Sequence, residues 1–381
     1  MKIVHIGIHS TFTENMKYQD NQLSHQNALD GHTVTYISNA QKYVDGKIVN
    51  TGYEKKTLND GVCLIRLPYV SFGNSLLTNK LRCVSGLYEL LDESSPDIIF
   101  IHDLCFMSVS DVVKYKRSNP TVKLFADTHT AAYNSGTNWF SLHILHRTIY
   151  RKWIQSALPY LEKFFYVGVD EAQFAVRNYK VPEELMEFLP LGGNVPDAAF
   201  YQKVRMERRN ELAIPENGRL YMHSGKLDKE KKTEELLDAF YHVEDENAQL
   251  IIIGSIPDGR KETITSLIAR DKRVKHLGWK TGDELIEYLC ASDLYCQPGT
   301  VSATMQNAVC NYCPVMTYPH KTYQHKLDWG NLIFVENQRD IEHAFKEIAG
   351  NPEMLKELKE YSKMCAEELL DYRVIAAHMY V

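Results

Sequence analysis

Short runs of apolar residues alternate with longer amphipathic stretches through both halves of the chain. Such runs in the first half are KIVHIGI, HTVTYIS, VCLIRLP, DIIFIHD, KLFADTH and KFFYVGV; in the second half they are LYMHS, AQLIIIGS, RVKHLGW and NLIFVEN. AQLIIIGS (248–255) is apolar almost without a break, which is typical of a strand buried on both faces of a parallel sheet. Strands that alternate with helices in this way predict an α/β protein with two doubly wound, Rossmann-like domains.

The segment LPLGGNVPDAAF (189–200) interrupts this alternation and is rich in Gly, Pro and Asn, so we take it as the linker between two domains. A chain of 381 residues is also too long for one ordinary core. We therefore expect a first domain over 1–198 and a second over 199–365. The last helical stretch of the tail has no strand after it, so residues 366–381 are predicted to form a C-terminal helix that crosses back to the first domain.

Composition and charge narrow the class of protein. Hydrophobic residues make up 44% and charged residues 24%, which describes a globular protein. The formal charge of −6 argues against binding to nucleic acid, which usually needs a basic face. No run approaches the ~18 apolar residues of a transmembrane helix, and the first strand is too short for a signal peptide. We expect a cytoplasmic protein.

The eight cysteines are dispersed along the chain, mostly in apolar surroundings, as reduced core thiols are. Cys310 and Cys313 form a single CxxC with neither a second pair nor a histidine at ligand spacing. No metal site is therefore expected.

Two neighbouring motifs of the second half suggest a phosphate site. In SGKLDKEKKTEELLDAF a strand ends at Gly225, and a charged loop with Lys226 and Lys231 leads into a helix. In QPGTVSAT a strand enters a Pro-Gly turn, and a hydroxyl-rich segment opens another helix. Unpaired N–H groups at a helix start favour an anion, and the lysines would add point charges, so we expect a nucleoside diphosphate here. The candidate residues of the turn are Gly299, Thr300, Ser302, Ala303 and Thr304. Simple helix capping by the hydroxyl groups is the alternative interpretation.

The order of these motifs resembles that of retaining glycosyltransferases of the GT-B fold (glycosyltransferase group 1, family 4-like). The likeness rests on SGKLDKEKK followed by an apolar helix, on HLGW (276–279), on an Ala-Ser-Asp-Leu strand, and on a Pro-containing turn before a Pro-Val strand. It implies a nucleotide sugar, UDP- or GDP-linked, bound to the second domain, an acceptor on the first, and no metal or further cofactor. By this resemblance Lys226 and Lys231 contact the diphosphate and Leu277 lies among the donor-binding residues.

One departure from that family's pattern bears on the donor. The family commonly has two glutamates separated by seven residues, and this chain has Gly299 and Asn307 at the matching places. The Asn307 amide is still able to hydrogen-bond a ribose hydroxyl. Gly299 has no carboxylate to offer, so contacts to the donor sugar are expected from backbone and hydroxyl groups of the turn.

The first half places polar residues after several predicted strands. Asp127 and His129 lie at the end of KLFADTH. The resemblance places His129 at the donor sugar or its departing oxygen; a loop histidine that caps a helix is the plain alternative. His102 and Asp103 end DIIFIHD and are second candidates, either to contact the acceptor or to act as a general base. A base is considered because an attacking hydroxyl must lose its proton. The first strand's loop adds three candidates for lining the cleft: Gly7, His9 and Ser10.

The stretch from Asn138 to Phe165 combines aromatic residues with Arg147, Arg151 and Lys152. Such a helix is suited to peripheral contact with the inner face of an anionic membrane or to a lipid-linked acceptor. A core-packing helix with a solvated basic face is the alternative. The LLTNKLRCVSGLYELL segment around Cys83 raises the same possibility.

The sequence thus predicts a glycosyltransferase that moves a sugar from a nucleotide diphosphate donor to a hydroxyl of a glycan or lipid-linked acceptor, with retention and without metal. Two other hypotheses stay open. The absent glutamates fit a catalytically silent module that binds a glycan or a partner enzyme, and the same architecture serves nucleotide-sugar epimerases.

Overall fold

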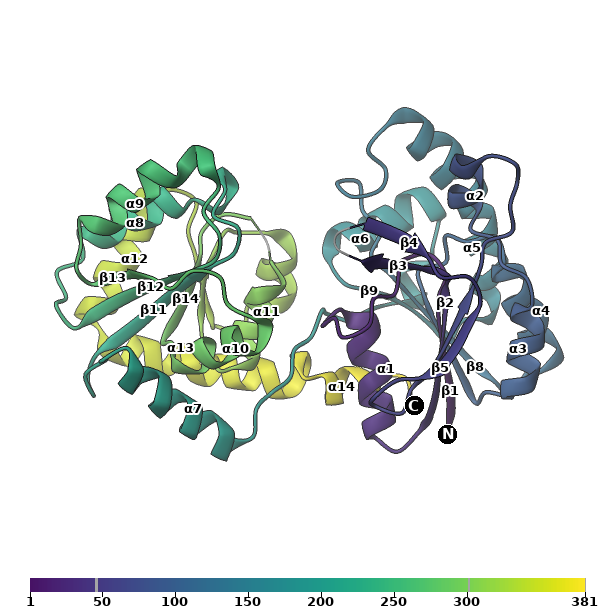
Figure 1. Ribbon diagram of the computed structural model, residues 1–381, viewed down its shortest axis with the longest axis horizontal. Helices are drawn as coiled ribbons and strands as arrows, with labels where there is room; N and C mark the ends of the chain where they lie inside the picture. Colours follow the sequence, from purple (N-terminus) through teal and green to yellow (C-terminus); the bar gives the residue numbers. More distant parts are fainter. Residues whose placement is uncertain (45–46, 301, 381) are drawn as a thin grey trace. The chain divides into compact units, whose positions relative to one another are not determined.

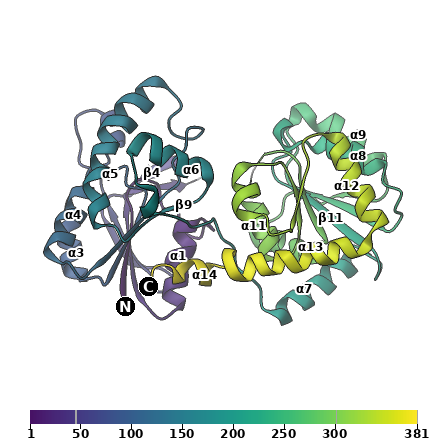
Figure 2. The same ribbon diagram turned by 180° about the vertical axis from the view of Figure 1, so that it is seen from behind.

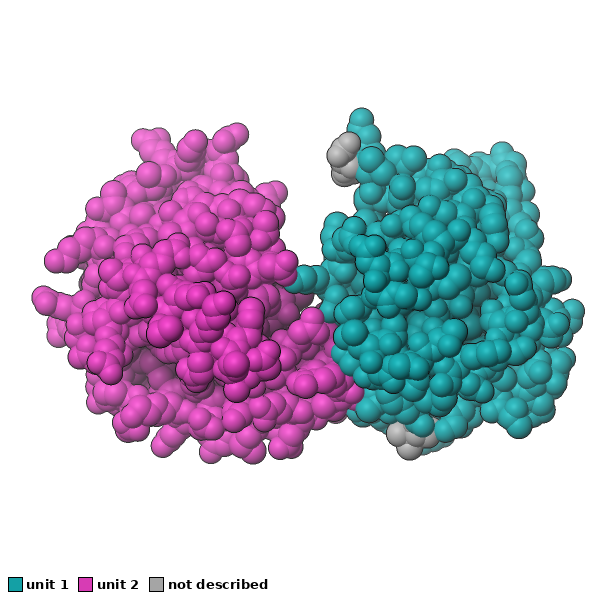
Figure 3. All heavy atoms as spheres, turned by 60° about the horizontal axis from the view of Figure 1, so that its bottom comes forward, with its two compact units in different colours: residues 1–190, 375–381 teal, residues 191–374 magenta. Residues whose placement is uncertain are grey.

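The computed structural model describes residues 1–381 except 45–46, 301 and 381. The chain divides into two compact units, Met1–Pro190 with Ile375–Val381, and Leu191–Val374 (Figure 3). The first division therefore falls at 190/191, where the sequence predicted 198/199, and the chain returns to unit 1 at 375, where 366 was predicted. The linker segment 189–200 contains the first of these divisions.

Unit 1 is built on an eight-stranded sheet in the order β10-β9-β8-β7-β1-β2-β6-β5, parallel except for the β5–β6 pair. Helices α3, α4 and α5 cover one face and α1 the other (Figures 1 and 2). A separate hairpin, β3–β4, follows β2. The strands are β1 (Lys2–Gly7), β2 (Thr33–Asn39), β3 (Gln41–Val44), β4 (Lys47–Asn50), β5 (Glu54–Thr57), β6 (Cys63–Leu67), β7 (Ile98–His102), β8 (Lys123–Thr128), β9 (Lys163–Tyr166) and β10 (Met186–Phe188).

The helices of unit 1 are mostly short, and several contain a π-type turn. They are α1 (Gln19–Leu29), α2 (Ser75–Leu81), α3 (Leu87–Ser94), α4 (Val109–Ser118), η1 (Ser141–Tyr150), α5 (Arg151–Ala157), η2 (Leu158–Tyr160), α6 (Val169–Phe174), η3 (Ala175–Tyr179) and η4 (Glu183–Leu185).

Unit 2 contains a six-stranded, fully parallel sheet in the order β13-β12-β11-β14-β15-β16. As expected from AQLIIIGS, residues Leu250 to Ile253 are at most 2% exposed. The strands are β11 (Arg219–Ser224), β12 (Ala248–Ile253), β13 (Val274–His276), β14 (Leu294–Gln297), β15 (Val315–Thr317) and β16 (Leu332–Phe334).

Helices cover both faces of this sheet (Figures 1 and 2). They are α7 (Ala198–Glu211), η5 (Lys229–Lys231), α8 (Thr233–Tyr241), η6 (Asp258–Arg260), α9 (Lys261–Ala269), α10 (Gly282–Ala291), α11 (Ala303–Cys310), η7 (Tyr323–Leu327), α12 (Gln338–Gly350), α13 (Pro352–Cys365), η8 (Ala366–Leu370) and α14 (Tyr372–Ala377). The prediction of two doubly wound α/β bodies is confirmed.

The C-terminal residues are held on unit 1 by polar contacts. The Tyr380 hydroxyl bonds Asp30 and accepts a hydrogen bond from the Asn27 amide at 2.7 Å, and His378 Nδ1 lies 2.8 Å from Glu187. Among the described residues, no helix is long and apolar enough to cross a membrane.

Candidate functional site

The carboxyl edge of the unit 2 sheet is built on close contacts between glycines. Gly225 follows β11 with φ of 130°, and Gly254 follows β12 with φ of 140°, both in the region that favours glycine. A Cβ added at Gly254 would lie 1.8 Å from the Gly225 carbonyl oxygen. The two strand ends therefore touch through their backbones, and neither position accepts a side chain without rearrangement.

The turn after β14 is in equally close contact with η5. A Cβ at Gly299 would lie 1.9 Å from the Glu230 carbonyl oxygen and 2.8 Å from Lys231 Cα, and the Thr300 N–H donates to that same carbonyl at 3.1 Å. A glutamate at position 299 would have no room in this packing. Gly299 thus holds the lysine loop against the turn, and its absent carboxylate is a structural requirement of this chain.

Lys231 extends across this glycine edge. A Cβ at Gly225 would lie 3.2 Å from Lys231 Cε and 3.7 Å from its Nζ. Burial lowers the pKa of Lys231, and the nearby Asp228 carboxylate acts in the opposite direction. Lys226 is exposed. The structure therefore places Lys231 with Gly225 and Gly299, and it shows no comparable contact for the Lys226 side chain.

The start of α11 combines capping with a free backbone donor. The Ser302 side chain accepts a hydrogen bond from Thr304 N at 3.1 Å, and Met305 N donates to Ser302 O at 3.0 Å. Thr300 O accepts a hydrogen bond from the Gln297 amide. The amide of Ala303 has no partner among the described residues. Capping by Ser302 is thus present, and the Ala303 N–H is a donor left for an anion.

Two further donor candidates differ in their surroundings. Leu277 N donates to Ile252 O at 2.9 Å, and Gly254 N donates to Gly278 O at 2.8 Å, so the Leu277 loop is held against the glycine edge. The Asn307 Oδ1 atom faces the linker, where a Cβ at Gly193 would lie 3.1 Å from it.

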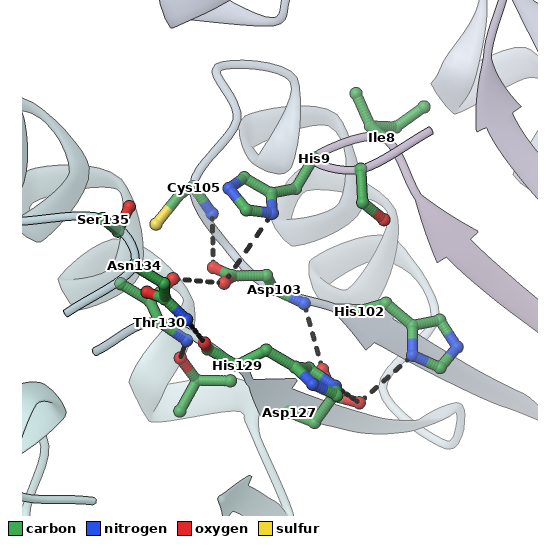
Figure 4. A network of polar contacts seen from close by, with 12 residues as sticks. Ile8, His9, His102, Asp103, Cys105, Asp127, His129, Thr130, Asn134 and Ser135 are labelled. Atoms are coloured by element: carbon green, nitrogen blue, oxygen red, sulfur yellow. Dashed lines mark hydrogen bonds and ion pairs between the residues drawn. The ribbon is translucent and has the colours of Figure 1, made fainter. Parts of the chain in front are cut away.

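In unit 1 the predicted candidates meet around the Asp127 carboxylate (Figure 4). Asp127 is completely buried at the end of β8. Its Oδ1 accepts from Asp103 N at 3.1 Å, and its Oδ2 lies 3.1 Å from His102 Nδ1 and 3.5 Å from His129 Nε2. Burial raises the pKa of Asp127, but His102 and His129 outweigh it and lower the pKa well below its usual range. Asp127 is therefore an anion whose two oxygens are already engaged.

His129 is the cationic partner that reaches the surface, with 36% of its side chain exposed. Burial alone would lower its pKa, but the Asp127 carboxylate raises the pKa to about 9. His129 is thus protonated at neutral pH, and it is suited to donate a hydrogen bond or to neutralise an anion, not to accept a proton.

A buried chain of hydrogen bonds fixes the charge of His102. Tyr380 donates to Asp30, so its hydroxyl oxygen accepts from the Asn27 amide N–H. The Asn27 carbonyl oxygen therefore accepts from His5 Nε2 at 2.7 Å, which leaves His5 Nδ1 as an acceptor for His102 Nε2 at 3.0 Å. His102 Nδ1 also donates, to Asp127, so the network assigns His102 two protons and a positive charge.

The pKa directions agree with this assignment. Burial lowers the pKa of His5 to about 3, and the charge on His102 acts in the same direction. Burial also opposes protonation of His102, but Asp20 and Asp127 raise its pKa on balance. His102 is 2% exposed with both ring nitrogens bonded, so the hypothesis that it contacts an acceptor is corrected: it supports Asp127 from within.

Asp103 and His9 form the other side of the network. Asp103 is 3% exposed, has φ of 63°, and accepts hydrogen bonds from Thr130 Oγ1 at 2.6 Å and from Cys105 N at 3.3 Å. Its Oδ2 lies 3.8 Å from His9 Nδ1. Burial lowers the pKa of His9 to about 4 although Asp103 opposes this, so His9 is neutral. Asp103 therefore orders the loops, and its predicted base duty is corrected because its oxygens are engaged.

Asp20, which the sequence analysis missed, connects Gly7 and Ser10 to the same network. A Cβ at Gly7 would lie 2.0 Å from the Tyr36 hydroxyl, which donates to Asp20 at 3.0 Å. Ser10 Oγ donates to the same carboxylate at 3.4 Å, and His102 Nδ1 lies 3.6 Å from it. A single Asp at the start of a helix gives no sequence signal that it joins a buried network. His5 did give such a signal, because it is a polar residue inside an apolar strand.

Within the described residues, no three His, Cys, Asp or Glu side chains are grouped so that they could bind a metal ion.

Comparison with known proteins agrees with this geometry in unit 2. Residues 204–364 match the family model for glycosyl transferases group 1. The matched range covers most of unit 2. That range includes the glycine edge, Lys231 and α11. A search of curated proteins found no match.

Several solved structures share the fold of the whole chain. A glycosyltransferase from Rickettsia africae ESF-5 is 13% identical with a TM-score of 0.66, over 99% of this chain and 96% of that one. Sucrose-phosphate synthase from Thermosynechococcus elongatus is 16% identical with a TM-score of 0.63, and the match covers 100% of this chain and 97% of that one. Anabaena Alr3699/HepE in complex with UDP is 13% identical with a TM-score of 0.65, and the match covers 100% of this chain and 98% of that one. The chain has the GT-B fold.

Replacing Gly299 with Ala should destabilise the protein by about 1–3 kcal/mol, because the new Cβ must displace the Glu230 carbonyl. Urea denaturation measures the free energy of unfolding. Gly259→Ala is the matched control, since nothing lies within 4 Å of a Cβ there. Equal stability of the two variants would contradict the close contact between η5 and the turn.

The pair of His129 and Asp127 should stabilise the fold in a pH-dependent way. The pKa of His129 is raised from 6.5 to about 9, so this contribution is complete below pH 6.5 and disappears as the pH rises through 9. The difference in unfolding free energy between the wild type and His129→Gln, followed by urea denaturation across that range, should shrink toward high pH. A difference that stays constant or grows with pH would refute the ion pair.

Nitrogen-15 NMR of the imidazole rings tests the assigned protonation states. At neutral pH both ring nitrogens of His102 should be protonated, and His5 should be protonated at Nε2 only. His223 is an internal comparison: burial lowers its pKa to about 4 and its Nδ1 faces the Cys296 carbonyl at 2.7 Å, so it should be neutral with the proton on Nδ1. A neutral His102 would contradict the chain of donors.

Proposed function

We propose that this protein transfers a sugar from a nucleoside diphosphate donor, UDP- or GDP-linked, to a hydroxyl group of a glycan or lipid-linked acceptor. One observation carries the proposal: η5 is held against the Gly299 turn, so that Lys231 and the start of α11 lie at one edge of the unit 2 sheet. All of these elements belong to the range that matches glycosyl transferases group 1.

This edge has the charge that a departing diphosphate requires. Negative charge grows on the phosphate oxygens as the bond to the sugar breaks, and donors fixed in advance stabilise that state more than the ground state. Lys231 would supply the cation, and the Ala303 N–H with the positive end of α11 would supply a dipole. We propose that this happens without a metal ion. Lys226, being exposed, is proposed as a second phosphate contact that closes on the bound ligand.

Unit 1 supports a proposal about the acceptor proton. His129 is already protonated at neutral pH, and the oxygens of Asp127 and Asp103 are engaged. The neutral His9 is a weak base, because burial lowers its pKa to about 4. We therefore propose that the acceptor proton passes to the leaving phosphate and that the configuration is retained. In this mechanism His129 would donate a hydrogen bond to the donor or to its departing oxygen, and His9 and Ser10 would contact the acceptor.

The binding of nucleoside diphosphates tests the proposal. UDP or GDP should raise the melting temperature of the wild type, and Lys231→Ala should weaken binding about 10–100-fold, because it removes a charge-assisted contact. Lys229→Ala, an exposed lysine on the same turn, is the matched control and should bind like the wild type. Calorimetry gives the dissociation constants.

The outcome of that experiment separates the alternatives. No shift with any nucleoside diphosphate would reject the proposal and favour a silent module. Equal binding by both variants would reject the role of Lys231 in holding the diphosphate. Turnover of a nucleotide sugar to an isomer without any acceptor would identify an epimerase.

A further inference from the structure

Helix α2 of unit 1 exposes apolar residues without covering any core. None of its seven residues is buried. Leu76 is 73% exposed and Leu77 47%, and in the preceding loop Val70 and Phe72 are 38% and 37% exposed. A surface helix normally packs its apolar residues against the protein, so these side chains have no partner that explains them.

A second exposed apolar pair precedes the neighbouring helix. Trp139 is 68% exposed and Phe140 58%, immediately before η1. The Tyr150 hydroxyl at the end of η1 donates to Lys80 O at the end of α2 at 2.9 Å, and the Arg82 guanidinium lies 5.8 Å from the Tyr150 ring. Figure 1 shows α2 beside the helix that continues into α5. We call Val70, Phe72, Leu76, Leu77, Trp139 and Phe140 the α2 surface.

The two chain segments that form the α2 surface carry charges of one sign. The chain has 49 acidic residues, yet none of them occurs in residues 61–88 or 128–161, the two segments that form this surface. Lys80, Arg147 and Lys152 of these segments are exposed. Among the described residues, no carboxylate forms an ion pair with any of the three. A protein of net charge −6 thus presents apolar and cationic groups together at one place.

We propose that the α2 surface docks unit 1 on a bilayer that contains anionic lipids. Leucine and aromatic side chains enter the boundary between headgroups and acyl chains, and lysine and arginine next to them contact lipid phosphates. The combination matches a lipid surface better than a protein, because exposed cations and exposed apolar residues occur in the same two segments and these segments contain no acidic residue.

Docking would also position a groove that α2 helps to form. A groove of about 390 Å³ lies between α2 and the β3–β4 hairpin, and its lining is uncharged, with Gln41, Asn50, Tyr69, Asn74 and Asn79 among the residues. Tyr69 at its base donates to Ile8 O at 2.8 Å, in the loop that also carries His9 and Ser10. If the proposed function holds, this arrangement suits a lipid-linked acceptor whose head group enters the groove.

Vesicle binding tests the docking surface with the whole chain. The wild type should sediment with vesicles of phosphatidylcholine and phosphatidylglycerol and not with phosphatidylcholine alone. The double substitution Leu76→Ser/Leu77→Ser should weaken binding about tenfold or more, and Lys80→Ala about fivefold. Leu29→Ser is the matched control, because Leu29 of α1 is 65% exposed on the same unit and should have no effect.

Tryptophan fluorescence reports which surface meets the lipid. Anionic vesicles should shift the emission to the blue in the wild type and in Trp279→Phe, whereas Trp139→Phe should lose the shift; Trp279 is 73% exposed in unit 2. Absent vesicle binding, unchanged binding of the leucine variant, or self-association that the leucine variant abolishes would each overturn the proposal. The melting shift with UDP or GDP, measured on the same variants, keeps a failure of docking distinct from a failure of the proposed function.

Discussion

The candidate site depends on the contact of backbones at the carboxyl edge of the second sheet. At Gly254 and Gly299 a Cβ would overlap the backbone of Gly225 and of η5, and Gly225 has a φ of 130° that favours glycine. This packing seats η5 on the turn before α11 and lays the Lys231 side chain across Gly225. A lysine alone on a charged loop would be a solvated residue, but one whose stem is packed and whose pKa is lowered by burial is a group fixed in place. The geometry of the candidate site therefore follows from the absence of side chains at these glycines.

The first unit depends on a different interaction, which stabilises charged side chains buried at the end of a parallel sheet. A buried carboxylate is costly unless it is paired and hydrogen-bonded, and Asp127 is matched by two imidazolium groups and a backbone N–H. The proton on His102 is dictated by neighbours on three other elements, through His5 and Asn27 to the C-terminal Tyr380. The C-terminal return to unit 1 thus contributes to the charge state of residues at the far end of the strands. His129, with 36% of its side chain exposed, carries this charge to the surface.

Much of this arrangement could be predicted from local pattern. Apolar runs located the central strands, and their order placed Lys231, Ser302, Asp127 and His129 at carboxyl ends, because those positions depend only on alternation along the chain. The remainder depends on contacts between distant residues. Nothing in the sequence pairs Asp20 with Tyr36, or shows that Gly299 is required by the Glu230 carbonyl. The hairpin β3–β4 was missed because its residues are mostly exposed and do not alternate with a buried face. His102 and Asp103 were correctly placed at a strand end, but pattern alone could not reveal that both are buried and engaged.

Hydrogen–deuterium exchange with and without UDP, and likewise GDP, tests the central claim most directly, because it locates a bound diphosphate along the chain. Slower exchange in residues 225–232 and 299–306, with the Ala303 amide among the protected positions, is the result that this account requires. Protection confined to unit 1, or protection elsewhere in unit 2 with these two segments unchanged, would contradict it.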